Sequence, residues 1–341
     1  MDKKYKILIG IFAVVILAIA FVIIGNAKTT AAITLTNSDK NKTAELQTIN
    51  FRLPIPMNEA EFTDFYVAQE LGFYKEEGLD LKINLGSPEL NPIKMVSSGA
   101  DDFGLLGGPD TLIVARSKNI PLKAIAVLHK NSNLPILITL KSSGITTVEQ
   151  LEGKKIGFNY GHISTDVLRT LFKKEDINVQ EVDIGMNYNP LIAGQIDASW
   201  GFMFTAAINL PAKGIEINII NPSEYGIPVH GYTIFTRDDL IKNNPELVDK
   251  FWKATKKGIE YTSTHPDEAL DIIMKYIPDG NRSLELQRLT LHNKLKSNAN
   301  GLEAGYMDNH MFQETYDRLK EEKVLANDFN VSDVFTTKFL N

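Results

Sequence analysis

The chain has no cysteine among its 341 residues. Disulfide bonds, thiolate metal sites and cysteine nucleophiles are therefore excluded, and so is the lipid-acceptor cysteine that tethers a bacterial lipoprotein. Basic residues are outnumbered, with 36 Lys and Arg against 42 Asp and Glu, which gives a formal net charge of -6. Because a nucleic-acid-binding protein normally carries a basic face, this balance argues against nucleic acid as a partner.

Motifs of the common enzyme classes are missing as well. The sequence shows no Ser-His-Asp or paired-carboxylate motif and no Gly-x-x-x-x-Gly-Lys-Ser/Thr loop. What the chain does have is length and apolar content, since 43% of its residues are hydrophobic. This is enough to fill the cores of two domains of ordinary size. We therefore predict a globular protein that is not an enzyme and has no cofactor.

The N-terminus combines a basic start with an uncharged apolar run from Ile7 to about Gly25. Such a run is long for the core of a signal peptide and just long enough to span a bilayer. The basic residues that precede it, which favour a cytoplasmic start, are Lys3, Lys4 and Lys6. We expect residues 1–25 to form an uncleaved signal-anchor helix, which would hold the protein at the cell surface on the cytoplasmic membrane.

A cleaved signal peptide is the alternative, because Thr30-Ala31-Ala32 is a loose cleavage site. The protein would then be secreted or periplasmic. Residues 26–47 are rich in Thr, Ala, Asn and Lys and have no sustained periodicity, which predicts a flexible linker.

The stretch from Phe65 to Ile83 predicts a helix followed by a strand. Thr63 or Asp64 can cap the helix, and Gly72 supplies the left-handed position that ends it. Beyond the turn at Gly78 the apolar residues alternate with polar ones, which is typical of a strand.

Strands and helices continue to alternate, which predicts α/β lobes with mainly parallel sheets. Later strands are expected at Pro135–Leu140, Ala198–Phe202 and Tyr232–Arg237, and the last part of the chain is helical. The most economical fold has two lobes joined by crossovers near Leu140 and Tyr232, and one larger doubly wound sheet is the alternative. We assign residues 48–140 and 237–341, including the C-terminal helices, to the first lobe and residues 141–236 to the second.

Several segments carry a resemblance to a known family. They are Phe65–Ile83, Gly99–Gly104 with Arg116–Leu122, Leu151–Gly157, Asn187–Asp197, and Asn221–Pro228 followed by Pro245–Glu246 and His265–Ala269. Over about residues 48–270 the chain resembles the substrate-binding proteins of ABC importers for thiamine pyrimidine precursors, riboflavin, sulfonates and nitrate. The resemblance implies a type II periplasmic-binding-protein fold, α/β and two-lobed, that closes on a small molecule between its lobes.

Two stretches depart from the pyrimidine binders of this family. Their first loop usually carries a Trp, where this chain has Pro54–Asn58, and an Asn-Tyr-Glu-like stretch follows a strand of their second lobe, where this chain has Trp200–Thr205. The acidic partner for a ring amine is therefore missing at that place.

Ligands of open α/β sheets lie beyond the carboxyl ends of the strands, so the loops there are the candidate site. The predicted ligand-binding residues are Asn58, Tyr66, Gly107, Gly108, Asp110, Tyr160, His162, Ser164, Thr165, Asn187, Trp200, Phe202 and Phe204. In a strand, Trp200, Phe202 and Phe204 share one face, and such an aromatic wall suits a flat ring. Arginine is scarce near these loops, which favours a neutral or weakly basic ring over a sulfonate or nitrate.

Each of these residues also has a structural alternative. Gly107 and Gly108 could form a simple turn, and Ser164 or Thr165 could cap a helix. His162 could be a solvated loop residue, and the aromatic residues could belong to the core. Trp252 lies in an amphipathic helical pattern and is assigned to the core.

The predicted function is the extracytoplasmic solute-binding component of an ABC importer. Its partners would be a small-molecule ligand, the permease with its ATPase, and the membrane through the N-terminal helix, and we expect a monomer. An anion receptor of the sulfonate or nitrate type is one alternative. Another is a pyrimidine-precursor enzyme, because the resemblance extends to fungal enzymes that depend on a cysteine-rich motif and iron, although this chain has no cysteine. A surface sensor using the same closure is the third.

Overall fold

The fold is described from a computed structural model, which covers residues 45–130, 132, 134–160, 162–227, 229–296 and 305–340, leaving aside the side chains of Ile163 and Ser164. The expected anchor helix at 1–25, and nearly all of the expected linker at 26–47, lie outside these residues. Within the described part of the chain, no helix has both the length and the apolar character needed to cross a membrane.

The first sheet has five strands in the order β2-β1-β3-β10-β4. Their bounds are β1 Gln47–Arg52, β2 Leu79–Asn84, β3 Phe103–Leu106, β4 Leu122–Val127 and β10 Thr233–Arg237. Strand β1 pairs in parallel with β2 and β3, whereas β10 runs antiparallel to β3 and β4. Strand β10, the last of the five in the sequence, therefore lies inside the sheet and not at its edge.

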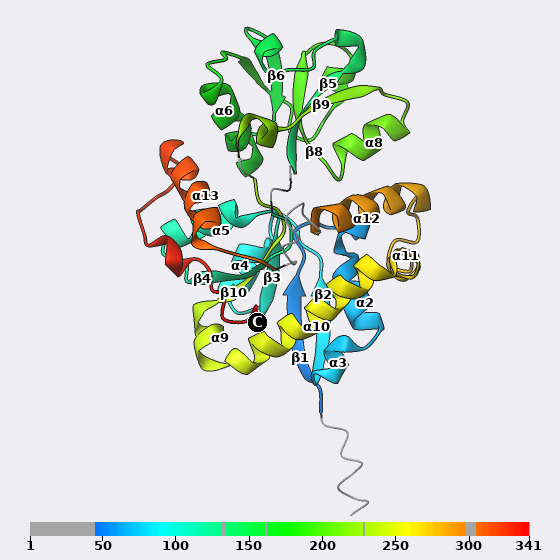
Figure 1. The fold of residues 1–341 in the computed structure, drawn as a ribbon, viewed down its shortest axis with the longest axis vertical. Helices are drawn as coiled ribbons and strands as arrows, with labels where there is room; N and C mark the ends of the chain where they lie inside the picture. The colour runs from blue at the N-terminus through cyan, green and yellow to red at the C-terminus, as the bar shows by residue number, and fades with distance from the viewer. Residues whose placement is uncertain are drawn as a thin grey trace, which may run out of the picture. The chain divides into compact units, whose positions relative to one another are not determined.

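The second sheet repeats this arrangement in the order β7-β6-β8-β5-β9. Its strands are β5 Pro135–Leu140, β6 Lys155–Phe158, β7 Gln180–Asp183, β8 Ala198–Phe202 and β9 Ile217–Ile220. Here β5 is the reversed strand, antiparallel to β8 and β9. In both sheets the reversed strand is the one on which the chain arrives from the other sheet (Figure 1).

The second crossover lies near Tyr232 as predicted, whereas the first lies before Pro135 and not near Leu140, so the lobe boundaries at 140 and 236 are wrong. Strand β5 belongs to the second sheet and β10 to the first, so the chain crosses before Pro135 and before Thr233. Both strands are buried along nearly their whole length. A buried strand has apolar residues on both faces whichever sheet it joins, so its pattern does not reveal its partners.

Helices cover both faces of each sheet (Figure 1). Those packed with the first sheet are α2 Thr63–Glu70, α3 Phe73–Glu76, α4 Pro92–Ser97, α5 Pro109–Ser117, α9 Asp238–Asn243, α10 Pro245–Thr264, α11 Pro266–Met274 and α13 Asn309–Glu321. Those of the second are α6 Ile163–Lys174, α7 Asn189–Ile192 and α8 Ala206–Ala212, and α12 Arg282–Lys296 contacts α8. Short 3-10 helices lie at Ala60–Phe62 (η1), Lys141–Ser143, Glu149–Leu151, Pro222–Tyr225 and Val331–Asp333.

The core of the first sheet is built on aromatic residues. The rings of Phe103 and Phe251 are stacked with centroids 3.9 Å apart, and Phe51 packs against Phe251 from β1. Trp252 on α10 is 2% exposed, which confirms its assignment to the core. These contacts fix α10 across the face of β1 and β3, so the loops that follow those strands start from a rigid layer.

The predicted cap of α2 is wrong. No side chain caps this helix, and Thr63 donates a hydrogen bond to the carbonyl oxygen of Ala60. Gly72 does have the predicted left-handed conformation, at φ 80°. The short helix α3 between Gly72 and Gly78 was not expected.

Asp64 instead binds two side chains of α12. It accepts hydrogen bonds from Lys296 Nζ at 2.7 Å and His292 Nε2 at 2.8 Å. His292 Nδ1 lies 3.0 Å from Nε2 of His129, which follows β4. Burial alone would raise the pKa of Asp64, but the Lys296 ammonium and His292 outweigh it and hold this pKa well below its usual range. A buried polar chain thus ties α12 to α2 and to the start of the first crossover.

Candidate functional site

A cavity of about 590 Å³ lies between the loops of the two sheets. From the first sheet it is lined by segments that follow β1 and β3, namely Pro54–Met57 with Glu59 and Glu61, and Leu106–Thr111 without Pro109. From the second it is lined around β8 by Trp200, Phe202, Phe204 and Thr205, with His162, Val167 and Met186 nearby. The second crossover adds Val229, His230 and Tyr232. The cavity therefore occupies the carboxyl ends of the parallel strands, where an α/β sheet binds ligands.

Aromatic rings form one wall of the cavity. Trp200 and Phe202 lie 5.5 Å apart in an edge-to-face arrangement, and the His162 ring is 5.5 Å from each of them. Phe204 stacks on Tyr232 with centroids 6.1 Å apart. The indole Nε1 of Trp200 donates to the carbonyl oxygen of Gly185 at 2.8 Å, which fixes the ring. This wall presents π faces and edges that suit a flat ligand.

The structure brings together seven of the predicted residues on the cavity lining. They are Gly107, Gly108, Asp110, His162, Trp200, Phe202 and Phe204. Five others lie outside the lining, namely Asn58, Tyr66, Tyr160, Thr165 and Asn187. The side chain of Ser164 is outside the described part of the chain.

Residues outside the lining are engaged elsewhere. Tyr66 donates its hydroxyl to Asn58 and packs its ring against Tyr276 at 4.3 Å, and Asn58 Nδ2 donates to the backbone of Tyr276 at 3.3 Å. Both therefore help to attach the end of α11 to α2. Neither was expected to meet a helix that lies so far along the chain.

Three predicted residues from loops of the second sheet also make their contacts outside the cavity. Tyr160 is 48% exposed and faces the Arg169 guanidinium, which lies 5.7 Å from its ring. The side chain of Asn187 accepts a hydrogen bond from the backbone of Asn189 at the start of α7, at 3.0 Å. Thr165 is buried and donates to the carbonyl oxygen of Asn159 at 2.8 Å. These side chains shape their own loops.

The two glycines of the lining differ. A Cβ on Gly107 would meet nothing within 4 Å, so this position borders open space. A Cβ on Gly108 would lie 2.6 Å from the carbonyl oxygen of His230, so Gly108 allows the second crossover to approach β3. Of these two predicted ligand-binding positions, only Gly107 leaves its backbone open to a ligand.

No arginine is among the described lining residues, but two arginines contact residues of the lining from behind. Arg318 on α13 pairs with Asp110, and both side chains are buried. Arg288 on α12 donates Nε to the carbonyl oxygen of Phe204 at 3.0 Å and Nη2 to Asn209 at 2.6 Å, and Nη1 bonds Glu285. These cations come from the C-terminal helices, and carboxylates engage both. Arg288 also connects α12 to the second sheet.

The sequence analysis missed two carboxyl groups on the lining, Glu59 and Glu61. Glu61 Oε1 accepts a hydrogen bond from the Tyr232 hydroxyl. The Oε2 atoms of Glu59 and Glu61 are buried and have no hydrogen-bond partner among the described residues. The two residues are 8% and 4% exposed. Burying a polar atom without a hydrogen-bond partner costs free energy. These two oxygens are therefore available to form hydrogen bonds in the cavity.

The pKa of Glu61 is raised to about 8, chiefly by burial and next by the neighbouring Glu59 carboxylate, while the bond from Tyr232 and the charge of Arg288 oppose the rise. Burial also raises the pKa of Glu59, although Arg288 lies 3.9 Å away and opposes this. The cavity therefore contains a carboxyl group that is mostly protonated at neutral pH.

One sequence signal could have identified these residues. Glu59-Ala60-Glu61 directly follows Asn58, the last residue of the loop after β1 that the sequence assigned to the site. Two acidic residues on either side of one alanine, at the end of a leading strand, are candidates for a site. The described residues hold no group of three or more His, Asp or Glu side chains arranged for a metal ion.

The raised pKa gives Glu61 a predictable effect on stability. Between pH 4.5 and about 8 the folded protein keeps a proton on Glu61 that the unfolded chain releases, so stability falls as the pH rises through this window. Glu61→Gln removes this linkage, and we expect it to raise the free energy of unfolding at pH 8 by roughly 3 kcal/mol and at pH 5 by much less. Urea unfolding of both proteins at the two pH values measures the difference. Equal gains at both pH values would contradict the assignment.

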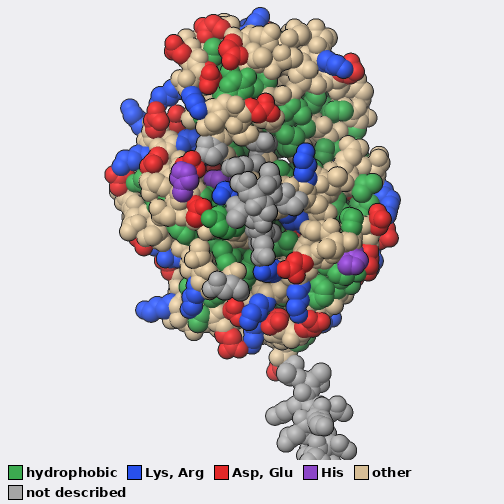
Figure 2. Space-filling model, in the orientation of Figure 1, with side chains coloured by type: hydrophobic (Ala, Val, Ile, Leu, Met, Phe, Trp, Pro, Cys, Tyr) green, Lys and Arg blue, Asp and Glu red, His purple; other side chains and the backbone are tan. Residues whose placement is uncertain are grey.

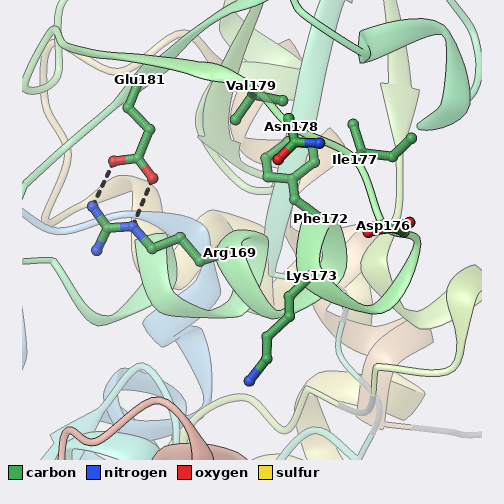
Figure 3. A pocket seen from close by; sticks show the side chains of 8 residues that line it. All are labelled: Arg169, Phe172, Lys173, Asp176, Ile177, Asn178, Val179 and Glu181. Carbon is green, nitrogen blue, oxygen red and sulfur yellow. Dashed lines mark hydrogen bonds and ion pairs between the residues drawn. The ribbon is translucent and has the colours of Figure 1, made fainter.

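A second hollow of about 390 Å³ lies beside α6 and β7, away from the cavity (Figure 3). Figure 3 shows Arg169 paired with Glu181, and the two hydrogen bonds measure 2.8 and 2.7 Å. The guanidinium is thus held by a carboxylate of its own sheet. This hollow contains none of the predicted site residues.

Several known proteins resemble this chain in sequence or in fold. The chain is 26% identical to the riboflavin-binding protein RibY of Chloroflexus aurantiacus, over 82% of each chain. It is 27% identical to a formylaminopyrimidine-binding protein of Halalkalibacterium halodurans, over 71% of this chain and 76% of the relative. It is also 27% identical to a 4-amino-5-hydroxymethyl-2-methylpyrimidine phosphate synthase of Legionella pneumophila, over 82% of this chain and 88% of the relative.

The crystal structure of the periplasmic aliphatic sulphonate binding protein SsuA of Escherichia coli has the same fold, with a TM-score of 0.69, 12% sequence identity, and coverage of 86% of this chain and 99% of that one. The two-sheet α/β fold of a periplasmic binding protein is thereby established for this chain. The NMT1/THI5 like family matches residues 59–269, which is more than half of the 341 residues, and the protein therefore belongs to this family.

Proposed function

We propose that the protein is the extracytoplasmic solute-binding component of an ABC importer and closes its cavity on a small, flat, neutral or weakly basic heteroaromatic compound, such as a thiamine pyrimidine precursor. The observation that carries this proposal is the aromatic wall of the cavity, formed by Trp200, Phe202, Phe204 and Tyr232. Relatives whose names state riboflavin and formylaminopyrimidine as ligands support a ring compound.

Closure requires a hinge, and the two crossovers supply one. Where they pass each other, the backbone N–H of Leu128 donates to Tyr232 at 2.7 Å and that of Gly231 donates to His129 at 2.8 Å. A short paired segment between two lobes can absorb the rotation of a closing domain. Because both segments lie at the cavity, a ligand there would favour the closed form.

An anion receptor of the sulfonate type is the alternative. The fold of SsuA supports it, but Glu59 and Glu61 line this cavity, and Arg288 is bonded to Glu285. An ionised carboxylate repels a sulfonate or nitrate, and the described residues of the lining include these carboxyl groups and no arginine or lysine, so this alternative is the weaker one.

A biosynthetic enzyme is the other alternative, since one relative is named as a synthase. The resemblance ties the fungal reaction to a cysteine-rich motif, and the chain has no cysteine. We therefore propose a non-enzymatic receptor that acts as a monomer with a permease and its ATPase, held at the outer surface of the cytoplasmic membrane by the N-terminal segment. Figure 2 shows acidic and basic side chains interspersed over the coloured part of one face, in keeping with partners other than nucleic acid.

Calorimetric titration of the full-length chain with formylaminopyrimidine, hydroxymethylpyrimidine, riboflavin, taurine and nitrate tests the ligand class. We expect a ring compound to bind, and we expect Trp200→Ala to weaken that binding by about tenfold or more, because the flat contact is lost. Trp200→Phe keeps a ring and should keep most of the affinity. Binding of taurine or nitrate alone would show that the cavity is an anion site.

Trp200 is also a core residue, 1% exposed, so its truncation can destabilise the fold. Gly107→Leu gives an independent test, because a side chain at this lining position meets open space instead of packed atoms. We expect this variant to unfold at nearly the same urea concentration as the wild type and to lose binding of the ring compound about tenfold or more, since its side chain occupies ligand space. Unchanged affinity would place the ligand elsewhere.

A further inference from the structure

The polar part of the cavity has an unusual balance of charges. Three carboxyl groups, those of Glu59, Glu61 and Glu285, lie near one guanidinium, that of Arg288. The guanidinium bonds Glu285, Asn209 and the backbone of Phe204, and its nearest approach to Glu59 is 3.9 Å. Its hydrogen bonds are therefore directed away from Glu59 and Glu61.

Glu59 and Glu61 form a pair with spare hydrogen-bonding capacity. Tyr232 supplies one donor to Glu61, and one oxygen of each residue has no partner among the described residues. Both side chains line the cavity, beside an aromatic wall that attracts cations as well as flat rings. Among the described residues, no cationic side chain donates a hydrogen bond to Glu59 or Glu61, and Arg288 approaches Glu59 only to 3.9 Å.

Resting on the proposed function, we propose that Glu59 and Glu61 are the specificity-determining residues of the cavity and select flat ligands that carry a basic nitrogen, as an amidinium or ammonium group, over neutral or anionic rings of the same shape. With the cation bound, two positive groups instead of one would face the three carboxyl groups. Its N–H groups would supply hydrogen bonds to the two carboxylates, and the ring would lie against Trp200 and Phe202.

The same arrangement couples binding to proton release. The charged and titratable groups around Glu61 are Glu59, Glu285, Arg288 and Tyr232. In the empty cavity Glu61 keeps its proton at neutral pH, because burial and Glu59 raise its pKa. A cation bound next to Glu61 favours the carboxylate, so the ligand displaces this proton to the solvent. A neutral ligand leaves the proton in place.

Benzamidine, benzamide and benzoate test the proposal, because they share one shape and carry a positive, zero and negative charge. Each is titrated calorimetrically into the full-length chain at pH 7, in phosphate and in Tris, since the difference in heat reports the protons released. We expect benzamidine to bind about tenfold or more tightly than benzamide, with release approaching one proton, and benzoate to bind least. In Glu59→Gln and Glu61→Gln the preference should fall roughly tenfold, and in Glu61→Gln the proton release should disappear.

Glu89→Gln is the matched control. It removes the same charge from an exposed position two residues before Asn91 of the lining, and we expect it to keep the preference and the proton release. Urea unfolding confirms that the Gln variants are folded. Equal binding of benzamidine and benzamide overturns this proposal, and so does a preference for benzamidine that is unchanged in both Glu59→Gln and Glu61→Gln. In either case, binding of a ring compound would leave the proposed function standing. If neither these probes nor the pyrimidines and riboflavin bind, both fall together.

Discussion

We expect Asp64→Ala to lower the free energy of unfolding at pH 6 by about 3–5 kcal/mol. The substitution leaves the Lys296 ammonium, 5% exposed, without the carboxylate that lies 2.7 Å from it, and it removes the partner of His292. Burial already lowers the pKa of Lys296, and Asp64 opposes this. Without Asp64, Lys296 binds its proton more weakly in the folded protein than in the unfolded chain. The loss of unfolding free energy should therefore shrink as the pH rises toward 9.

Urea unfolding at pH 6 and pH 9 measures this effect. Glu76→Ala is the matched control, because Glu76 pairs with Lys257 at 2.8 Å on the surface, where it is 56% exposed. An exposed pair contributes only about 0–1 kcal/mol, so the control should change little at either pH. An equal loss of unfolding free energy in both variants would mean that the buried pair stabilises the fold no more than the exposed pair does.

Arg288→Met is the second substitution with a large expected effect, about 3–5 kcal/mol at pH 8. It keeps much of the apolar volume but removes the cation bonded to Glu285 and the contacts to Phe204 and Asn209. Loss of this charge lets the pKa of Glu59 rise further, because Arg288 is the group that lowers it. Since the folded state then retains a proton that the unfolded chain releases, the deficit should be smaller at pH 5 than at pH 8.

The double variant Arg288→Met/Glu285→Gln provides the check. Removing the bonded carboxylate together with the cation should recover part of the lost stability, and a thermodynamic cycle gives the coupling. If the double variant is as unstable as the sum of the single variants predicts, the two groups are not coupled and the loss reflects packing alone.

Local pattern was sufficient for much of the fold. Strands β5 at Pro135–Leu140 and β8 at Ala198–Phe202 have the predicted bounds, and helix α10 at Pro245–Thr264 lies in the part of the chain predicted to be helical. In β8 four buried residues are followed by the partly buried Phe202, and in α10 an apolar stripe lies between a proline start and a histidine end, so local signals and tertiary packing agree. The alternation of strands and helices was likewise enough for the α/β class.

Pattern failed where a residue's partner lies far along the chain. Asp64 looks like a helix cap in sequence, and only the packing of α12 reveals that it binds Lys296. Arg288 and Arg318 contact the lining residues Phe204 and Asp110 from C-terminal helices that the sequence assigned to packing alone. The aromatic wall could be predicted because its members alternate within one strand, whereas the carboxyl pair and its cation come from separate elements.

The reversed strands also set an order of assembly during synthesis. Strands β5 to β9 are contiguous in the chain, so the second sheet can form once the chain up to Ile220 is free to fold. Strand β4 pairs only with later segments, β10 and Phe335, among the described residues. Until β10 arrives, the nascent chain therefore carries a finished second lobe beside a first lobe with an open edge on β3. Such an edge invites pairing with another chain until Thr233–Arg237 is available to fill the gap between β3 and β4.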